Sequence, residues 1–470
     1  MTNKDAPVPE LACFHKRWKK NRDFLSGRDA VEKAGTAYLP KPTFDMPDDE
    51  YLGFLKNMLF YPAAIKVMNG WLGLVFKEKP DLIASSGQLE SIKHIVTKDG
   101  DSLEDFSRSL IRETFTTNWT GLLTDHPERP EGIQLTAANA IENGFRPFLA
   151  MYPAESVLEV RYGIVKNNRA FTYVRLLESD GIVHELSLQN GIYQIDTWTR
   201  TERGQWVLAK TVTPRRNGQP LTEIPFQIVS FSNSKLPTPS VFDPVVDLNC
   251  EVWTLTGQLM EGLRWTIHPI VTVSGVEQDT DKDGNPVSRS WHRGPGTVWE
   301  LTGTEMTVNV HEFVGQNVNT INGIIRDKHS ELARTGSRIL ADDKAVAEAA
   351  ETIALRQESD NAILAGMVRH IAQFIQNALV TMDWWLGGTA DDIRFELNTD
   401  YTVTELSDAR TQIAMALHQG GYITDVEFFK YLQRPGGFID PVVTYDEHQT
   451  QLESAVIDRP ATQSDGGAMA

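Results

Sequence analysis

One stretch of the sequence has residue types and spacing that could bind a metal ion. Carboxylates alternate at Asp279, Asp281 and Asp283 and are followed by Gly284. The first half of an EF-hand loop has this pattern, because its carboxylates converge on calcium and its glycine permits a sharp turn. The twelfth position of such a loop carries a bidentate glutamate, whereas this sequence has Ser290. The match therefore covers only half of a calcium loop.

The residues on either side of this acidic stretch favour strands over the two helices that flank a calcium loop. Residues 271–273 and 297–299 alternate between apolar and polar side chains, which is the period of a strand. Asn285 and Pro286 follow the acidic residues and are typical of a tight turn. The acidic tip of a hairpin is therefore the favoured interpretation, and a calcium site is the alternative.

No common catalytic signature accompanies this stretch. The sequence contains no phosphate-binding G-x-x-x-x-G-K-[ST] loop, no G-x-S-x-G elbow, no H-E-x-x-H and no C-x-x-C. Its 11 histidines are scattered, and its two cysteines, Cys13 and Cys250, form neither a disulfide framework nor a zinc site. We therefore expect no enzymatic activity, cofactor or metal. A calcium-dependent enzyme that uses residues 279–283 is a less favoured alternative.

The composition is that of a folded, acidic protein. The 470 residues include 63 Asp and Glu against 45 Lys and Arg, a formal net charge of −18, and 41% are hydrophobic. At about 150 residues per domain, this length corresponds to about three units. No stretch approaches the ~20 apolar residues of a membrane-spanning helix, and the polar start predicts no signal peptide. The acidic charge argues against tight DNA binding but is compatible with DNA that passes without sticking.

Residues 1–240 combine two hydrophobic periods. Up to about residue 150 the sequence is mainly helical, with Pro62 as a break and Ser102 or Asp101 as a helix cap. From about 155 to 235 the period changes to two, with strands at 170–175, 193–198 and 206–208 separated by turn residues. An antiparallel sheet covered on one face is expected there.

The next element is a helix that begins with a strong start signal, Asp243 followed by Pro244. A narrow apolar stripe, typical of a seam between helices, follows at spacings of three and four and comprises Val245, Leu248, Val252, Leu255 and Leu259. Asp243, Asp247 and Glu251 form a second row four residues apart. Such a row is usually a solvated face, and the alternative is a face that lines a path for a polyanion.

The remaining elements alternate between helices and short β segments. The pattern predicts strands within 266–310, a helix over 313–334, a break, a long helix over 343–386 and a strand at 393–397. Two further helices are predicted over 406–418 and 425–432, and the tail at 455–470 is expected to be disordered. A β module between two antiparallel helices with narrow stripes favours an elongated subunit that packs against copies of itself.

Short segments of the sequence together resemble one known family. They are, in order, AGTAYLP at 34–40, LFYPAA at 59–64, GWLGLVF at 70–76, GLLTDHP at 121–127, RPFLAMYPAE at 146–155, IPF at 224–226, ELARTGSRIL at 331–340 and EAAET at 348–352. Their order and spacing over about residues 30–435 resemble tailed-bacteriophage portal proteins, of the group long catalogued as a domain of unknown function.

This resemblance implies an α+β portal fold and a dodecameric ring at one capsid vertex. The implied parts are a wing at 1–240, a first stem helix at 241–265, a clip at 266–312, a second stem helix at 313–334, a tunnel loop at 335–342, a long wing helix and short strand at 343–400, a helical crown at 401–454 and a disordered tail at 455–470. The implied location is the virion, after assembly in the host cytoplasm.

The resemblance also implies partners and site residues. The clip tip, formed by Asp279, Asp281, Asp283 and Gly284, would dock the terminase large subunit and later a head–tail adaptor or tail protein. The major capsid protein or scaffold would hold the ring, and double-stranded DNA would pass without sequence-specific binding. The tunnel-loop residues are Arg334, Thr335, Gly336, Ser337, Arg338 and Asp342.

Three questions stay open in this interpretation. Arg334 and Arg338 would either touch phosphates or neutralise a helix end beside acidic residues. Another virion structural protein, such as an adaptor or scaffold component, is the main alternative function. A direct nucleic-acid binder is a further alternative, which the acidic charge disfavours.

Overall fold

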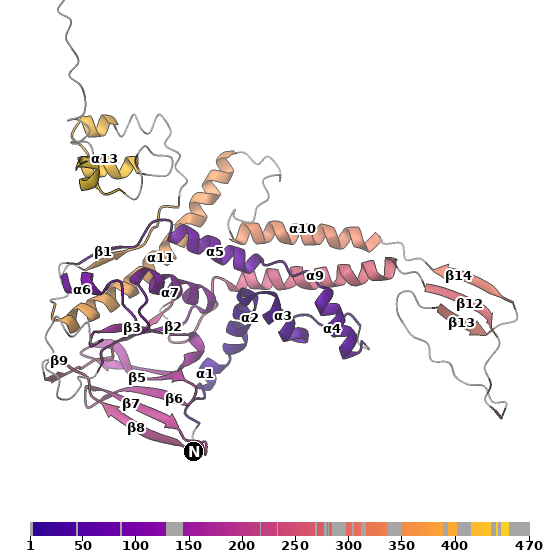
Figure 1. Ribbon diagram of the computed structural model, residues 1–470, viewed down its shortest axis with the longest axis horizontal. Helices are drawn as coiled ribbons and strands as arrows, with labels where there is room; N and C mark the ends of the chain where they lie inside the picture. Colours follow the sequence, from indigo (N-terminus) through magenta and orange to yellow (C-terminus); the bar gives the residue numbers. More distant parts are fainter. Residues whose placement is uncertain are drawn as a thin grey trace, which may run out of the picture. The chain divides into compact units, whose positions relative to one another are not determined.

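The computed structural model describes residues 3–43, 46–84, 87–127, 144–216, 218–232, 234–267, 270–276, 280, 282–283, 298–302, 305–311, 316–336, 350–388, 393–401, 415–433, 439 and 443–450. The chain divides into two compact units, Met1–Thr399 and Asp400–Ala470. Helices and strands come largely in separate runs in the first unit (Figure 1), which confirms the predicted α+β class. Among the described residues, no helix is long and apolar enough to cross a membrane.

The N-terminal part is helical, as predicted. Its elements are α1 (Pro9–Ala12), α2 (His15–Ser26), α3 (Arg28–Ala34), η1 (Gly35–Ala37), α4 (Asp48–Asn57), α5 (Ala63–Val75), β1 (Asp81–Ile83), α6 (Gly87–Ile92) and α7 (Leu103–Thr117). Pro62 is the N-cap of α5, where its missing N–H leaves no hydrogen bond unmade. The Ser102 side chain accepts a hydrogen bond from the Asp105 N–H and thereby caps α7.

A sheet of three antiparallel strands follows these helices, and the sequence pattern did not predict it. Its strands are β2 (Thr120–Asp125), β3 (Phe148–Tyr152) and β11 (Phe226–Val229), in the order β11-β2-β3. The expectation that residues up to 150 are mainly helical is therefore wrong for β2 and β3. Residues 120–124 are buried without alternation, so the strand period of two is not visible in the sequence.

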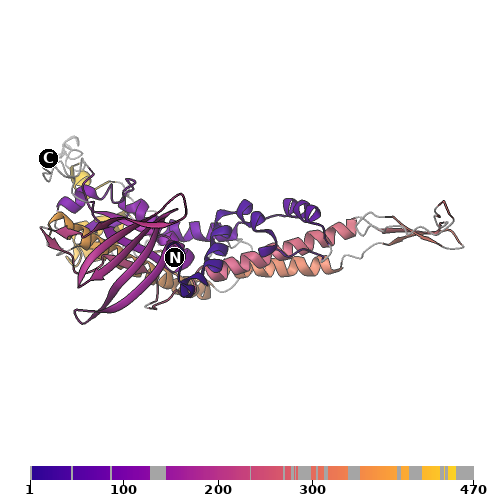
Figure 2. The same cartoon turned by 90° about the horizontal axis from the view of Figure 1, so that it is seen from below.

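The five-stranded antiparallel sheet lies where the period of two predicted a sheet. Its strands are β4 (Val157–Val165), β5 (Asn168–Ser179), β6 (Ile182–Gln189), β7 (Ile192–Arg200) and β8 (Trp206–Val212), paired in sequence order (Figure 2). Asn190 and Gly191 join β6 to β7 with positive φ angles of 52° and 78°, as a type I′ hairpin turn requires. Short elements, η2 (Ala154–Ser156), β9 (Arg215–Arg216) and β10 (Gln219–Pro220), border this sheet.

The hydrophobic core shared by the two sheets, here called the main core, includes helical residues from far away in the sequence. Trp18 of α2 and Trp119, just before β2, are buried together with Val174, Leu176 and Leu186 of the five-stranded sheet. Only one face of that sheet contributes to this core, because alternate side chains of a strand point to opposite faces. The N-terminal helices are therefore fixed against the sheets by the burial of large aromatic side chains.

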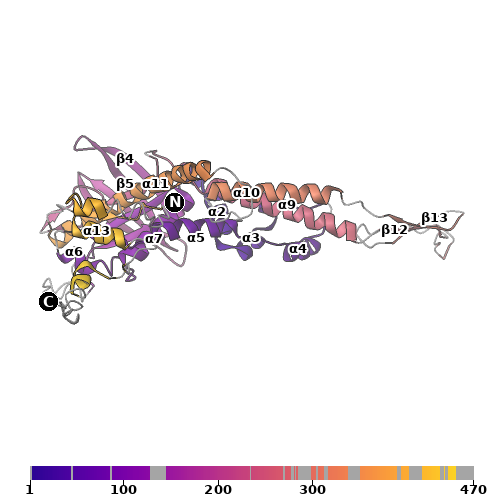
Figure 3. The ribbon, with the colours of Figure 1, turned by 90° about the horizontal axis from the view of Figure 1, so that it is seen from above.

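Two helices and a small sheet form the next segment. Helix α9 (Asp243–Ile267) and helix α10 (Gln316–Gly336) pack side by side in the views of Figures 1 and 3. Between them in the chain are β12 (Ile270–Val276), β13 (Val298–Thr302) and β14 (Thr307–His311). Strand β12 pairs with β13 in parallel and with β14 antiparallel. The hairpin predicted between the first two strands is therefore wrong, since a hairpin joins antiparallel strands and a parallel pair needs a long crossover.

The first unit ends with α11 (Ala350–Leu386) and β15 (Arg394–Glu396), which pairs with β1 more than 300 residues earlier. The predicted start of α11 at 343 lies outside the described residues. In the second unit, residues 415–419 are helical and α13 (Asp425–Leu432) begins with a capping box between Thr424 and Glu427. Residues 402–414 and the tail at 455–470 lie outside the described part of the chain.

Candidate functional site

The acidic row on α9 is paired with basic and amide side chains of α2. Asp243 is buried, and its Oδ1 accepts a hydrogen bond of 2.7 Å from Asn21 Nδ2. Asp247 lies 2.7 Å from Lys20 Nζ and 3.2 Å from Arg17 Nη1. Arg17 Nη1 also lies 3.4 Å from Asp243 Oδ2, so cations of α2 pair with both carboxylates. The path for a polyanion stays a prediction.

The third carboxylate of the row connects the two long helices. Glu251 on α9 lies 2.9 Å from Lys328 on α10, and Lys328 also lies 3.1 Å from Glu331. The next residue of α10, His329, packs edge-on against Tyr61, with ring centroids 4.5 Å apart. Burial, together with the nearby Lys66, lowers the pKa of His329 below its ordinary value. An ion pair thus joins α10 to α9, and an aromatic contact joins it to Tyr61, two residues before α5.

The apolar stripe of α9 divides into buried and half-buried positions. Val245, Val252 and Leu259 are buried within the single chain, and Leu248 and Leu255 are half-buried. The narrow stripe was expected to be covered by a neighbouring copy. This expectation is wrong for the three residues that are buried within the single chain.

The N-terminal segments pack against the opposite face of α9, at Gly257. A Cβ atom at Gly257 would lie 3.0 Å from Met58 Cε and 3.4 Å from Leu39 Cδ1. These side chains come from residues on either side of α4, so this part of the N-terminal region covers that face of α9 within the single chain.

The end of α10 differs from the predicted boundary of the tunnel loop. The helix continues through Thr335 and Gly336, which were assigned to the loop after residue 334. The Thr335 hydroxyl donates a hydrogen bond of 2.9 Å to the Glu331 carbonyl, so its polar group is satisfied inside the helix. Arg334 belongs to the last turn of α10, and Ser337, Arg338 and Asp342 lie outside the described residues.

The predicted clip tip is described only in part. Asp279, Asp281 and Gly284 lie outside the described residues, whereas Asp283 lies in a turn. Within the described ranges, no group of three or more His, Cys, Asp or Glu side chains could hold a metal ion. The structure therefore adds no support for the calcium interpretation of this stretch.

The β12–β14 sheet exposes apolar side chains. Every residue of β14 is exposed, including Val308 at 60% and Val310 at 56%, and Val298 of β13 is 57% exposed. Contiguous exposed apolar residues of this kind mark contact surfaces.

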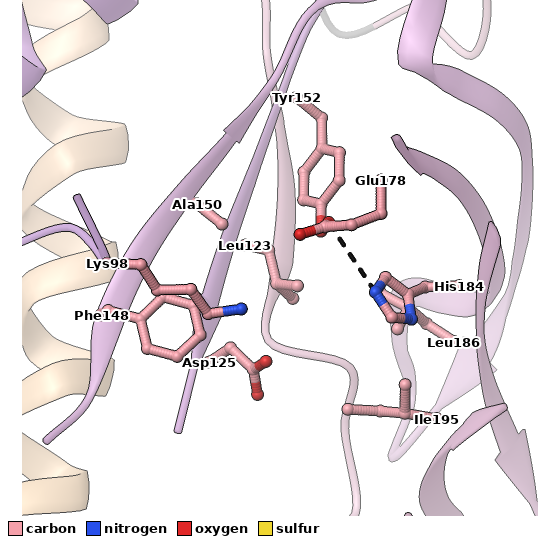
Figure 4. A pocket seen from close by; sticks show the side chains of 10 residues that line it. All are labelled: Lys98, Leu123, Asp125, Phe148, Ala150, Tyr152, Glu178, His184, Leu186 and Ile195. Atoms are coloured by element: carbon pink, nitrogen blue, oxygen red, sulfur yellow. Dashed lines mark hydrogen bonds and ion pairs between the residues drawn. The ribbon is translucent and has the colours of Figure 1, made fainter. Parts of the chain in front are cut away.

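A small polar cavity lies between the three-stranded and five-stranded sheets (Figure 4). Its polar lining comprises Lys98, Asp125, Tyr152, Glu178 and His184. The Tyr152 hydroxyl donates a hydrogen bond of 2.5 Å to Glu178 Oε2, and His184 Nε2 lies 3.8 Å from the same oxygen. No sequence pattern predicts this cluster, since its members come from a loop, two strands of the three-stranded sheet and two strands of the five-stranded sheet.

Two side chains of this cavity, Tyr152 and His184, have pKa values shifted toward their neutral forms. Burial raises the pKa of Tyr152, and the nearby Glu178 carboxylate raises it further. Burial also lowers the pKa of His184, with Lys98 acting in the same direction and Glu178 opposing it. The cavity measures about 30 Å³, far below the ~300–1,000 Å³ of a small-molecule site. It can hold water between the two sheets but not a substrate.

Comparisons with known proteins give a match to a family model and matches to solved structures. A family model described as "Domain of unknown function (DUF4055)" matches residues 243–386, which span α9, the inserted sheet, α10 and α11. No curated protein matches the chain. A chain from the neck of an empty GTA particle has 12% identity and a TM-score of 0.39, over 84% of this chain and 96% of that one. A chain from the virion of a native gene transfer agent (GTA) particle has 11% identity and a TM-score of 0.36, over 87% and 99%.

Proposed function

We propose that this protein is a structural component of a phage-like virion and that its copies form a portal-type ring through which DNA passes. The observation that carries the proposal is the pair of long helices, α9 and α10, which pack side by side and are joined by an inserted three-stranded sheet. This is the order of stem helix, clip and stem helix that the resemblance to portal proteins implies. The long α11 follows in the expected place of the wing helix.

Exposed apolar residues support assembly from several copies. The β12–β14 sheet has three strands, and covering its apolar face would stabilise it. Its exposed valines, together with the half-buried Leu248 and Leu255 of α9, are surfaces that neighbouring copies would cover. The three buried residues of the α9 stripe hold the subunit together and leave the half-buried pair for contacts between copies.

The proposed role involves no catalysis and no sequence-specific DNA binding. The net charge of −18 disfavours adhesion to DNA, and transient phosphate contacts are assigned to Arg334 and Arg338. The clip would bind the terminase large subunit during packaging and a head–tail adaptor or tail protein afterwards. The capsid protein or scaffold would surround the ring at one vertex of the virion.

Electron microscopy of the purified full chain, combined with native mass spectrometry, tests this proposal. We expect ring-shaped particles with a central opening and a mass that is a multiple of the 52.7 kDa chain, with a dodecamer among the species. A monomer at every concentration would contradict the proposal. Rings that bind the terminase large subunit favour a portal protein, whereas rings that bind only portal or tail proteins favour the adaptor alternative.

A further inference from the structure

The N-terminal segment of the chain crosses the five-stranded sheet. Trp206 Nε1 on β8 donates a hydrogen bond of 3.4 Å to Asn3 Oδ1, and the Val8 N–H donates one of 2.9 Å to the Leu158 carbonyl on β4. These two contacts lie on the two edge strands of the sheet. Residues 3–8, here called the strap, therefore reach from one edge of the sheet to the other.

The strap lies on the face of the sheet that points away from the main core. Val174 and Leu176 are core residues, so Arg175 between them points to the opposite face. The strand register pairs Arg175 with Glu185, and antiparallel partners share a face. Trp198 pairs with Val183, which lies two positions before Glu185 on the same strand, so Trp198 belongs to the same face.

Lys4 of the strap lies between Glu185 and Trp198 on this face, and these two residues form what is here called the Lys4 slot. The Lys4 Nζ lies 2.7 Å from Glu185 Oε1 and 3.6 Å from the centre of the Trp198 ring. The other carboxylate oxygen of Glu185 accepts a hydrogen bond of 2.9 Å from Trp198 Nε1. Glu185 is therefore oriented by the sheet itself, and the slot offers both a carboxylate and an aromatic face to an ammonium group.

Neighbouring residues of the sheet contact the rest of the strap. Arg200 Nη1 lies 3.5 Å from the Asp5 carboxylate, and Arg175 Nη2 donates a hydrogen bond of 3.1 Å to the Ala6 carbonyl. A negative group thus faces Lys4, and a positive group faces the residue after it. This arrangement matches the order lysine then aspartate, and reversing the order would place like charges together.

We propose that this face of the sheet is a peptide-recognition site for a lysine–aspartate segment, and that the strap of a second copy of this chain is its occupant in trans. In the isolated chain the site is filled by the chain's own strap. Every copy carries the same segment, so an exchange between copies retains each of these contacts. The inference does not depend on the proposed role in a virion.

A peptide-binding experiment tests recognition. A variant that lacks residues 3–7 is titrated with a synthetic peptide of residues 3–9 by calorimetry. We expect binding to this variant, binding at least about tenfold weaker for the peptide with Lys4→Gln, and weaker binding to the full chain, whose own strap competes for the same site. Equal binding of both peptides, or no binding to a truncated variant that keeps its cooperative thermal unfolding, would overturn the proposal.

An experiment on the full chain tests exchange and does not need the truncated variant. Isotopically labelled and unlabelled chains are mixed and treated with a carbodiimide, which links an amine directly to a carboxylate in contact. We expect crosslinks between Lys4 and Glu185 that join labelled to unlabelled peptides. The Lys4→Gln variant should lose this crosslink, whereas Lys19→Gln should keep it, because Lys19 pairs within its own helix with Asp23. Crosslinks confined to peptides of the same label would overturn the exchange.

Discussion

Lys328 on α10 and Glu251 on α9 form an ion pair of 2.9 Å that joins the two long helices. Hydrogen bonds to Glu251 and then to Glu331 raise the pKa of Lys328 above its ordinary value. A raised lysine pKa means that the folded state holds the proton more tightly. The contribution of the Lys328 ion pairs to folding stability is therefore complete below the unfolded pKa of 10.5. It is lost as pH rises through the pKa of Lys328 in the folded chain.

We expect Lys328→Gln to lower the melting temperature slightly at neutral pH and low salt. The pair is exposed to solvent, so high salt should shrink the difference between the two proteins. Thermal unfolding followed by circular dichroism at two salt concentrations measures this difference. Lys19→Gln is the control, since its ion pair lies within one helix. A difference that is unchanged by salt would contradict the electrostatic explanation.

Asp243→Ala should destabilise the chain far more than Asp247→Ala. Asp243 is buried and accepts hydrogen bonds from Asn21 Nδ2 and from the Ser240 N–H, so its removal leaves buried donors unpaired and costs about 2 kcal/mol. The side chain of Asp247 is 47% exposed, and its loss should cost about 0.5 kcal/mol. Urea unfolding of both variants measures the free energies, and equal losses would refute this account of the α9 start.

The cavity between the two sheets should make stability depend on pH through His184. Burial lowers the pKa of His184 in the folded state, so the unfolded chain binds the proton more readily. Stability should therefore fall as pH drops below the unfolded value of 6.5 toward the folded value. His184→Gln should lose less stability between neutral and mildly acidic pH than the unmodified chain.

Two other histidines also have lowered pKa values, so the His184 effect is a difference and not the whole pH dependence. Burial lowers the pKa of His126 and of His329 in the same direction. Urea midpoints of the unmodified chain and of His184→Gln, measured at the same pH values, isolate the contribution of His184. Parallel pH profiles for the two proteins would exclude it.

Within the proposed ring, Leu255→Asp and Val252→Asp should have different effects. Leu255 is half-buried in the single chain, so a carboxylate there should leave the subunit folded and prevent assembly. Val252 is 2% exposed, so the same change should unfold the subunit itself. Circular dichroism and native mass spectrometry separate the two outcomes. A Leu255→Asp chain that still assembles would show that this position does not face a neighbouring copy.

Deletion of residues 279–285 should leave the ring intact and weaken its docking to the terminase large subunit. The segment connects β12 to the rest of the inserted sheet and lies outside the helix pair along the chain. Ring formation by electron microscopy and terminase binding by co-purification are measured on the same preparation. Unchanged terminase binding would show that the clip tip is elsewhere.

Local chemistry in the sequence was sufficient to predict many of the secondary-structure elements. The predicted break at Pro62 lies between α4 and α5, Ser102 caps α7, and Asp243 with Pro244 marks the start of α9. The predicted strands at 170–175, 193–198 and 206–208 lie within β5, β7 and β8. These signals are readable because caps, proline and turn residues act on their immediate neighbours, and because a sheet with one covered face shows a period of two.

Tertiary structure alone decided which elements meet and which charges are neutralised. Strand β2 is buried without alternation and pairs with β11, about 100 residues later, so neither its period nor its partner is visible in the sequence. Asp247 appears in the sequence as part of an acidic row, yet Lys20 neutralises it from 227 residues away. The reason is physical: a helix or turn is stabilised by neighbours along the chain, whereas burial and ion pairing depend on neighbours in space.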